Sequence, residues 1–402
     1  MVSMADKLDL LAARERRGLA EFSIMLAAGL GLAALLLFLF AVPFAGNMAA
    51  SRDFVPYWAT GQQLVHHANP YDREAISRLE HDAGFGANFG LIMRNPPWAL
   101  PLVYPLGFVG LGVAFRVAFV LWTLLLLGCL LLSVSIVRKL HGSPPDPIHW
   151  LGLAFPPALI CIAIAQTSLF SLLGLVLFLR FHRSRPLTAG AALWLCALKP
   201  HLFLPFAAAL LAWIVVSRSY KLLAGAAAPL VLSSAAAFLI APTAWSEYNR
   251  MMRSPGVENE FVPCLADALR HWLWPQYPWT RYLPAVLACA WALVYFWRRR
   301  RAWDWIRNSS PLMLIALLAA PYSLLYDQGV LIPALMDGAY RTRSRHMLAA
   351  LAFLILAVDA EFCRVEVLSK LYLWTAPAWF VWYLLARAAT GEKSARPATT
   401  PA

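Results

Sequence analysis

An aspartate stands close to the end of a long apolar run in the stretch SRDFVPYW, residues 51–58. Phe54, Tyr57 and Trp58 follow Asp53 within about one or two helical turns. Aromatic faces beside a carboxylate suit a sugar ring, and partial burial of a carboxyl group raises its pKa and helps it act as a base. We therefore predict that Asp53 is a catalytic general base. The plainer interpretation is a solvated loop acid or an interfacial helix cap.

A lysine interrupts the apolar stretch LCALKPHLFLP, residues 195–205. A lysine in the middle of a membrane costs about 2.5–3.5 kcal/mol on insertion scales. Pro200 indicates that a helix ends here, at the outer interface. A compact ammonium group at a broken helix suits a phosphate, so we predict that Lys199 binds an anion. A lysine that snorkels to the interface is the alternative.

Further polar and aromatic side chains flank apolar runs on the same predicted side. Arg94 precedes a proline-rich stretch and could be a second phosphate contact, whereas Gln166 and Asp327 lie between apolar runs. For Gln166 and Asp327 the alternative is an ordinary polar turn. The predicted substrate-binding set is Lys199, Arg94, Tyr57, Trp58, Gln166, His201, Asp327 and Tyr326.

Metal and cofactor chemistry has weak support in the sequence. Glu80 and Asp82 have the acid–x–acid spacing that binds a divalent metal in some transferases, but one triplet is a poor signal. The sequence contains no CxxC, HExxH or Walker-type motif. We predict neither a metal site nor a cofactor.

The composition indicates a membrane protein. Of the 402 residues, 61% are hydrophobic and 14% are charged, against about 45–50% and about 25% in soluble domains. The apolar residues form blocks of about 15–25, the length that crosses a bilayer, and the 17 Trp fit interfacial belts. The sequence predicts an all-α polytopic protein with about twelve transmembrane helices. These lie near 22–46, 113–137, 148–165, 168–180, 186–198, 200–216, 222–241, 283–297, 310–326, 327–340, 346–359 and 371–387.

Basic residues alternate between the two sides of these spans. With the N-terminus in the cytoplasm, every second loop is basic, as the positive-inside rule requires. The net charge of +13 therefore reflects topology, and we expect no nucleic-acid partner. Residues 1–387 form one predicted membrane domain, and 388–402 a disordered cytoplasmic tail.

Two long segments, about 47–112 and 242–282, fall on the outer side and are rich in proline and aromatic residues. Their composition favours short helices on the membrane surface. The cytoplasmic loops leave no room for a nucleotide-binding domain, so any substrate chemistry must occur within the membrane or at its outer face. An enzyme is the leading hypothesis. A transporter or flippase of a lipid-linked sugar is the alternative, and a scaffold protein is a third possibility.

Five stretches, in order, resemble the motifs of glycosyltransferase family 87 and cover about residues 50–340. They are DFVPYWATGQQLVHHANPYD, NPPWALPLVYPL, AQTSLFSLLGLVLFL, LKPHLFLPFAAALL and YSLLYDQGVLIPAL. One departure is that family members often carry His where YDQG stands, which weakens the transfer of a role to Asp327.

The resemblance implies the membrane-embedded C-type glycosyltransferase fold and a sugar donor carried on polyprenyl phosphate. A mannose-like hexose would pass to a lipid or glycan acceptor with inversion, at the periplasmic face of a bacterial inner membrane. Membrane lipids would surround the chain, and both termini would be cytoplasmic. Asp53 would be the general base, and Lys199 and Arg94 would hold the departing phosphate.

Overall fold

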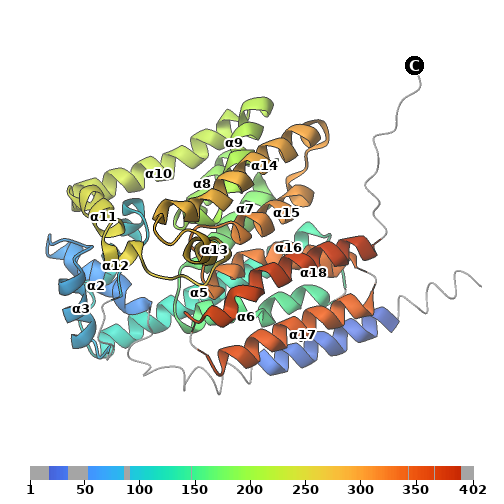
Figure 1. Cartoon of the computed structure of the whole chain (residues 1–402), viewed down its shortest axis with the longest axis horizontal. Coiled ribbons are helices and arrows are strands. Elements are labelled where there is room, and N and C mark those ends of the chain that lie inside the picture. Colours follow the sequence, from blue (N-terminus) through green and yellow to red (C-terminus); the bar gives the residue numbers. More distant parts are fainter. Residues whose placement is uncertain are drawn as a thin grey trace, which may run out of the picture.

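The computed structural model describes residues 18–34, 53–85, 91–145, 147–342, 344–365 and 367–390. These residues form helices and their connections, without a strand among them, as an all-α fold requires. The predicted tail lies outside the described residues from 391 onward. The longer helices after Gly18–Ala34 (Figure 1) are α2 Phe54–Val65, α3 Arg73–Asp82, α5 Val113–Leu140, α6 Pro156–Ala163, α7 Ser168–Phe181, α8 Pro186–Ala197, α9 Leu204–Ser217, α10 Tyr220–Ile240, α11 Ala244–Met252, α13 Leu265–Leu273, α14 Leu283–Arg299, α15 Trp305–Leu318, α16 Ile332–Arg341, α17 Arg345–Phe362 and α18 Thr375–Ala389.

Helical segments occupy the positions of the predicted spans, except that residues 35–46 of the first lie outside the described residues. By length and composition, two described helices could cross a membrane, α5 with 28 residues and α10 with 21. Shorter apolar helices such as α7 and α9 have 14 residues each, which is about 21 Å of helix against about 30 Å of hydrocarbon. The number of spans therefore stays a prediction.

Proline and short 3-10 turns divide the apolar runs. Pro156 and Pro186 begin α6 and α8, where the missing N–H and fixed φ of proline suit a first helical turn. The 3-10 segments Pro147–Ala154, Pro200–Leu202 and Leu325–Leu331 precede α6, α9 and α16. The result is a bundle of broken helices whose internal ends can carry side chains into the protein interior.

Small residues allow helices α8 and α10 to approach closely. A Cβ atom on Gly190 of α8 would lie 2.2 Å from the carbonyl oxygen of Leu222 in α10, and one on Gly225 would lie 2.2 Å from that of Leu187. Such contacts between backbones are typical of helices that pack in a membrane.

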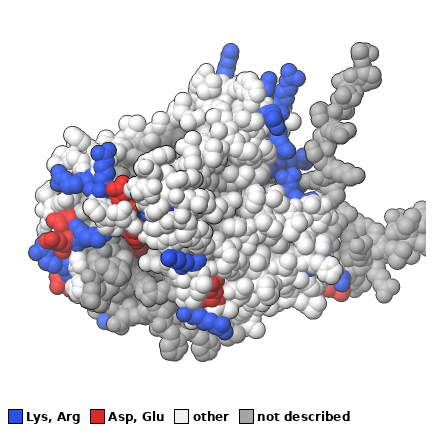
Figure 2. Space-filling model, in the orientation of Figure 1, with Lys and Arg blue, Asp and Glu red and all other residues white. Residues whose placement is uncertain are grey.

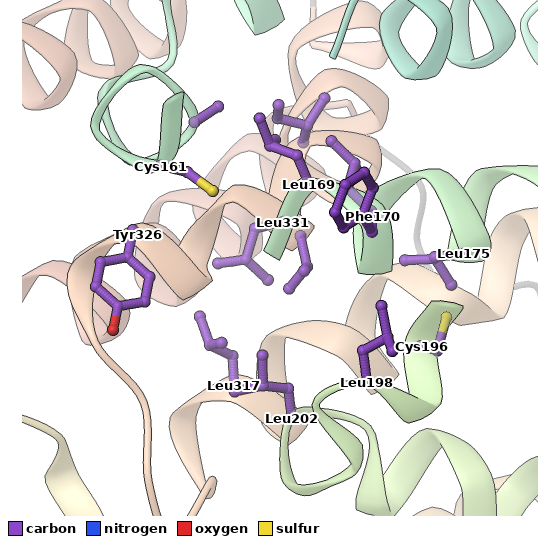
Figure 3. Close-up of a cluster of buried hydrophobic side chains, with 14 of the residues drawn as sticks. Cys161, Leu169, Phe170, Leu175, Cys196, Leu198, Leu202, Leu317, Tyr326 and Leu331 are labelled. Carbon is purple, nitrogen blue, oxygen red and sulfur yellow. The ribbon is translucent and has the colours of Figure 1, made fainter. Parts of the chain in front are cut away.

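An apolar cluster fills the centre of the bundle (Figure 3). Leu169, Phe170 and Leu175 of α7 meet Cys196 and the segment that follows α8, and Tyr326 stands at the edge of the cluster with its hydroxyl directed away from it. The 3-10 segment that contains Tyr326 therefore has one side in the core and a polar side beyond it.

The first outer segment differs from the prediction of surface helices. Every residue of α2 from Phe54 to Gly61 is buried. The Phe54 ring contacts Phe115 at 5.3 Å and Trp122 at 6.1 Å between centroids, because the aromatic residues that suggested an interface pack on α5 instead. Asp53 therefore stands at the start of an enclosed helix.

Candidate active site

Asp53 is the N-cap residue of α2, but its side chain makes no cap hydrogen bond. Its backbone N–H donates to the carbonyl oxygen of Ile164 at 3.2 Å, and the residue is partly buried. The helix-cap interpretation is therefore wrong for this carboxylate. Asp53 lies against the turn that joins α6 to α7.

That turn, residues 164–168, is an unusual piece of backbone. Ala165 has φ +63°, in the left-handed region that costs an L-residue about 1–2 kcal/mol. The indole N–H of Trp122 donates to the Ala165 carbonyl oxygen at 3.0 Å, and the Cys161 thiol donates to that of Gln166 at 3.1 Å. These bonds hold the strained turn in place.

Gln166 connects α2 to the 3-10 segment Leu325–Leu331. The Tyr57 hydroxyl donates to Gln166 Oε1 at 3.0 Å, and Gln166 Nε2 donates to the Tyr326 hydroxyl oxygen at 3.2 Å. The backbone N–H of Thr167 also donates to Gln166 Oε1. The predicted ligands Tyr57, Gln166 and Tyr326 thus form one hydrogen-bonded row.

Lys199 is buried in an ion pair. Its Nζ lies 2.7 Å from Asp327 Oδ1 and 3.0 Å from Ser168 Oγ, and 4.8 Å from the centroid of the Tyr326 ring. The Lys199 side chain is 8% exposed and that of Asp327 is 0% exposed, so Lys199 does not snorkel to the surface. Asp327 also accepts the Leu324 N–H at 2.9 Å, and is therefore more than a polar turn residue.

Arg94 lies beside this cluster. The backbone carbonyl of Leu198 accepts a 2.8 Å bond from Asn95 Nδ2, so Arg94 is held next to the turn that carries Lys199. The Arg94 guanidinium pairs with Glu260 and lies 5.6 Å from the centroid of the Tyr322 ring. His201 packs edge-on against the same ring at 5.5 Å.

Trp58 is the one predicted ligand that points elsewhere. Its indole N–H donates to the Val109 carbonyl oxygen at 2.7 Å, and its ring meets Phe115 at 5.3 Å. Neighbouring positions on a helix face different directions. Tyr57 therefore faces the turn that carries Gln166, whereas Trp58 faces Val109 and Phe115.

The sequence suggested Glu80 only as part of a weak metal triplet, although it offered a second signal for this residue. In the polar helix α3 the two buried residues are Ile76 and Glu80, four positions apart and hence on one face. Glu80 Oε2 accepts the Leu91 N–H at 2.9 Å. Burial raises the pKa of the Glu80 carboxyl to about 8, and the charge of Asp53 contributes to the rise.

The acid–x–acid triplet does not converge on a metal. Glu80 faces inward whereas His81 and Asp82 are exposed, and among the described residues no group of three acidic, histidine or cysteine side chains could hold an ion.

The site therefore combines one partly buried acid with two cations, Lys199 and Arg94, that each hold a carboxylate. An acid close to cations is an arrangement that suits group transfer. Two described helices are also long and apolar enough to cross a membrane, so the fold and the site fit the class of all-helical membrane transferases.

The sequence profile of glycosyltransferase family 87 matches residues 94–321, more than half of the chain. The chain belongs to glycosyltransferase family 87, as its motifs predicted, and is therefore a glycosyltransferase. The matched range includes Arg94, Gln166, Lys199 and His201, and begins after Asp53. No curated protein and no solved structure matches the chain.

Proposed function

We propose that this protein transfers a mannose-like hexose from a polyprenyl-phosphate donor to a lipid or glycan acceptor, with inversion at the anomeric carbon. The family supplies the transferase activity. The donor class, the acceptor class and the roles of individual residues are part of the proposal. The fold that we propose is the membrane-embedded C type of glycosyltransferase.

One observation carries the proposal: a single turn contacts both halves of the site. Ile164 accepts the Asp53 N–H, and Ser168, four residues later, contacts both Lys199 and Asp327. The turn fixes the acid relative to the Lys199–Asp327 pair, and Arg94 beside that pair supplies the cation that displacement of a phosphate leaving group needs.

Asp53 acts as the general base in this proposal. It removes the proton of an acceptor hydroxyl while that oxygen bonds to the anomeric carbon and the bond from this carbon to the phosphate oxygen breaks. Attack opposite the leaving group inverts the configuration, through an oxocarbenium-like transition state. The phosphate departs on its lipid, and cations beside it lower the barrier because negative charge grows there.

We propose that the site faces the periplasm of a bacterial inner membrane, with membrane lipids around the bundle and the N-terminus in the cytoplasm. The charge distribution supports this orientation. In Figure 2, Lys and Arg gather near the ends of α9 and α14, where Asp304 pairs with Arg183, whereas the region of α3 and α11 carries a mixture of both signs. The positive-inside rule assigns the end with the excess of basic residues to the cytoplasm.

The test is transfer of labelled mannose from a polyprenyl phosphate to extracted lipid by the purified protein. A positioned base contributes about 10²–10⁴-fold, so we expect Asp53→Asn to lose at least about 99% of the rate. Asp82→Asn, which changes an exposed acid of the same outer segment, should retain the rate. Equal transfer by Asp53→Asn and the unmodified protein would remove Asp53 from the mechanism.

A further inference from the structure

The two ion pairs of the site, Lys199–Asp327 and Arg94–Glu260, differ in their exposure to solvent. Lys199 and Asp327 are 8% and 0% exposed, and Asp327 has further bonds from Ser168 and Leu324. Arg94 and Glu260 are 24% and 31% exposed. An ion pair that is enclosed on all sides resists exchange, whereas a partly solvated pair is weak and can exchange its partner.

The ammonium group of Lys199 also has little remaining capacity to donate a hydrogen bond to a new ligand. It has three N–H donors, and its surroundings already supply Asp327 Oδ1, Ser168 Oγ and the face of the Tyr326 ring. The guanidinium of Arg94 carries five donors, and its polar side-chain partner among the described residues is Glu260. Arg94 is therefore the better equipped of the two to accept a new anion.

We propose that the Glu260 carboxylate holds the place of polyprenyl monophosphate on Arg94, and that this monoester, which forms when the sugar leaves its phosphodiester donor, displaces the carboxylate. The proposal rests on the function proposed above for the identity of its ligand. It assigns Arg94 as the exchangeable anion site and Glu260 as the competing group that sets the affinity of that site. Lys199 and Asp327 remain paired throughout.

The backbone around Glu260 is fixed on both sides, so exchange requires only a side-chain movement. Before it, the Glu258 carbonyl oxygen accepts from Arg281 Nη2 at 2.7 Å. After it, the Val262 N–H donates to Asp267 Oδ2 at 2.7 Å. Asp267 in turn lies 3.0 Å from the guanidinium groups of both Arg270 and Arg281.

The chemistry favours phosphate in this exchange. The phosphodiester donor carries one negative charge, as a carboxylate does, whereas the monoester that remains after transfer carries about −1.5 to −2 charges at neutral pH and presents three oxygens to the planar fork of an arginine. The Tyr322 ring beside Arg94 and the neighbouring His201 line the position that the phosphate group would enter.

The experiment measures binding without transfer. Farnesyl phosphate, a short polyprenyl monophosphate, is titrated into the purified full-length protein in detergent, with inorganic phosphate and farnesol as separate arms. We expect Glu260→Gln to tighten farnesyl phosphate binding about fivefold, the change that corresponds to about 1 kcal/mol for a partly exposed ion pair. Glu258→Gln makes the same charge change two residues away at an exposed position and should leave the affinity unchanged.

The companion variants locate the effect on Arg94. The tightening should vanish in the double variant Arg94→Gln/Glu260→Gln, and Glu260→Ala should reproduce it if Glu260→Gln folds poorly. If Glu260→Gln also binds inorganic phosphate more tightly, the protein recognises the phosphate group alone. If only the affinity for farnesyl phosphate increases, the lipid is needed for recognition too. Unchanged or weaker farnesyl phosphate binding by both Glu260 variants, or equal tightening of farnesol, overturns the proposal.

These results are separable from the proposed function. A protein that transfers no sugar but shows the fivefold effect would lose the transfer proposal and keep the anion exchange. A protein that transfers sugar with unchanged phosphate affinity in the Glu260 variants would keep its function and lose the exchange.

Discussion

The ammonium of Lys199 and the carboxylate of Asp327 pack in the interior 2.7 Å apart. Removing two charges from water costs several kcal/mol each, and their attraction repays this only with good geometry and extra hydrogen bonds. Ser168 and the Leu324 N–H supply those bonds. The pair is therefore sensitive to the loss of either partner.

Lys199→Met should lower the free energy of unfolding by about 3–5 kcal/mol, because it leaves the Asp327 carboxylate buried and unpaired. The double variant Lys199→Met/Asp327→Asn should recover much of this loss, since it removes both charges and keeps an acceptor for Leu324. Thermal unfolding in detergent measures both variants. A double variant no more stable than the single one would contradict this account of the pair.

Glu80 makes stability depend on pH. Its pKa is raised by burial from 4.5 to about 8, so between these values the unfolded chain binds fewer protons than the folded one at this position. The contribution of Glu80 to the free energy of unfolding is fully present below about pH 4.5 and is lost as the pH rises through about 8.

Glu80→Gln should flatten this dependence, because an amide keeps an acceptor for the Leu91 N–H and does not titrate. Between pH 6 and pH 9 the melting temperature of the unmodified protein should fall more than that of Glu80→Gln. Glu74→Gln, which changes an exposed acid of the same helix, should behave like the unmodified protein. Parallel curves for Glu80→Gln and the unmodified protein would disprove the assignment.

At the scale of elements, the turn between α6 and α7 positions the site. A glycine at residue 165 would relieve about 1–2 kcal/mol of left-handed strain, offset by about 0.4–1 kcal/mol of added freedom in the unfolded chain. Ala165→Gly should thus be neutral or stabilising by up to about 1.6 kcal/mol. Ala165→Val should destabilise and reduce transfer, since β-branched residues avoid positive φ. Thermal unfolding and initial transfer rates test the pair, and an equally stable Ala165→Val would argue against the strained turn.

Close contact with the 3-10 segment Tyr104–Phe108 fixes the position of helix α2. A Cβ atom on Gly61 would lie 2.6 Å from both the Val103 carbonyl oxygen and the Gly107 nitrogen. Gly61→Ala should therefore cost about 1–3 kcal/mol by overpacking, measured as a lower melting temperature, and should reduce transfer by moving Asp53. Gly110→Ala is the control, because nothing lies within 4 Å of its added Cβ; equal effects of the two changes would contradict this role.

The sequence predicted the helices well because runs of apolar residues bounded by proline determine where helices start. It also indicated Lys199, since a buried cation is costly and conspicuous. It could not reveal that Asp327 is the partner of Lys199, 128 residues away, or that Glu260 pairs with Arg94. Such pairings depend on how broken helices meet in three dimensions. The sequence did not predict the burial of α2, because aromatic residues are common both at a membrane interface and in contacts between packed helices.

For the whole molecule, the decisive property is the asymmetry of charge between its two ends. Figure 2 shows Lys and Arg in excess at the end where α9 and α14 finish, with a few acidic atoms beside them, and a mixture of both signs at the other end. The run Arg298–Arg301 lies at the end of α14, whereas the exposed Cys363 follows the last residue of α17. Our orientation places these two positions on opposite sides of the membrane.

Labelling with a membrane-impermeant maleimide can test on which side of the membrane each of these two positions lies. In intact spheroplasts it should label Cys363, which is already present and exposed, whereas the buried Cys129, Cys161, Cys196 and Cys264 should stay unmodified. In a Cys363→Ser background, Arg300→Cys should be labelled only in inverted vesicles, because the proposed orientation places its segment in the cytoplasm. Labelling of Arg300→Cys in intact spheroplasts would reverse the orientation. Asp53 and Lys199 would then face the cytoplasm, where a donor presented at the periplasmic leaflet could not reach them.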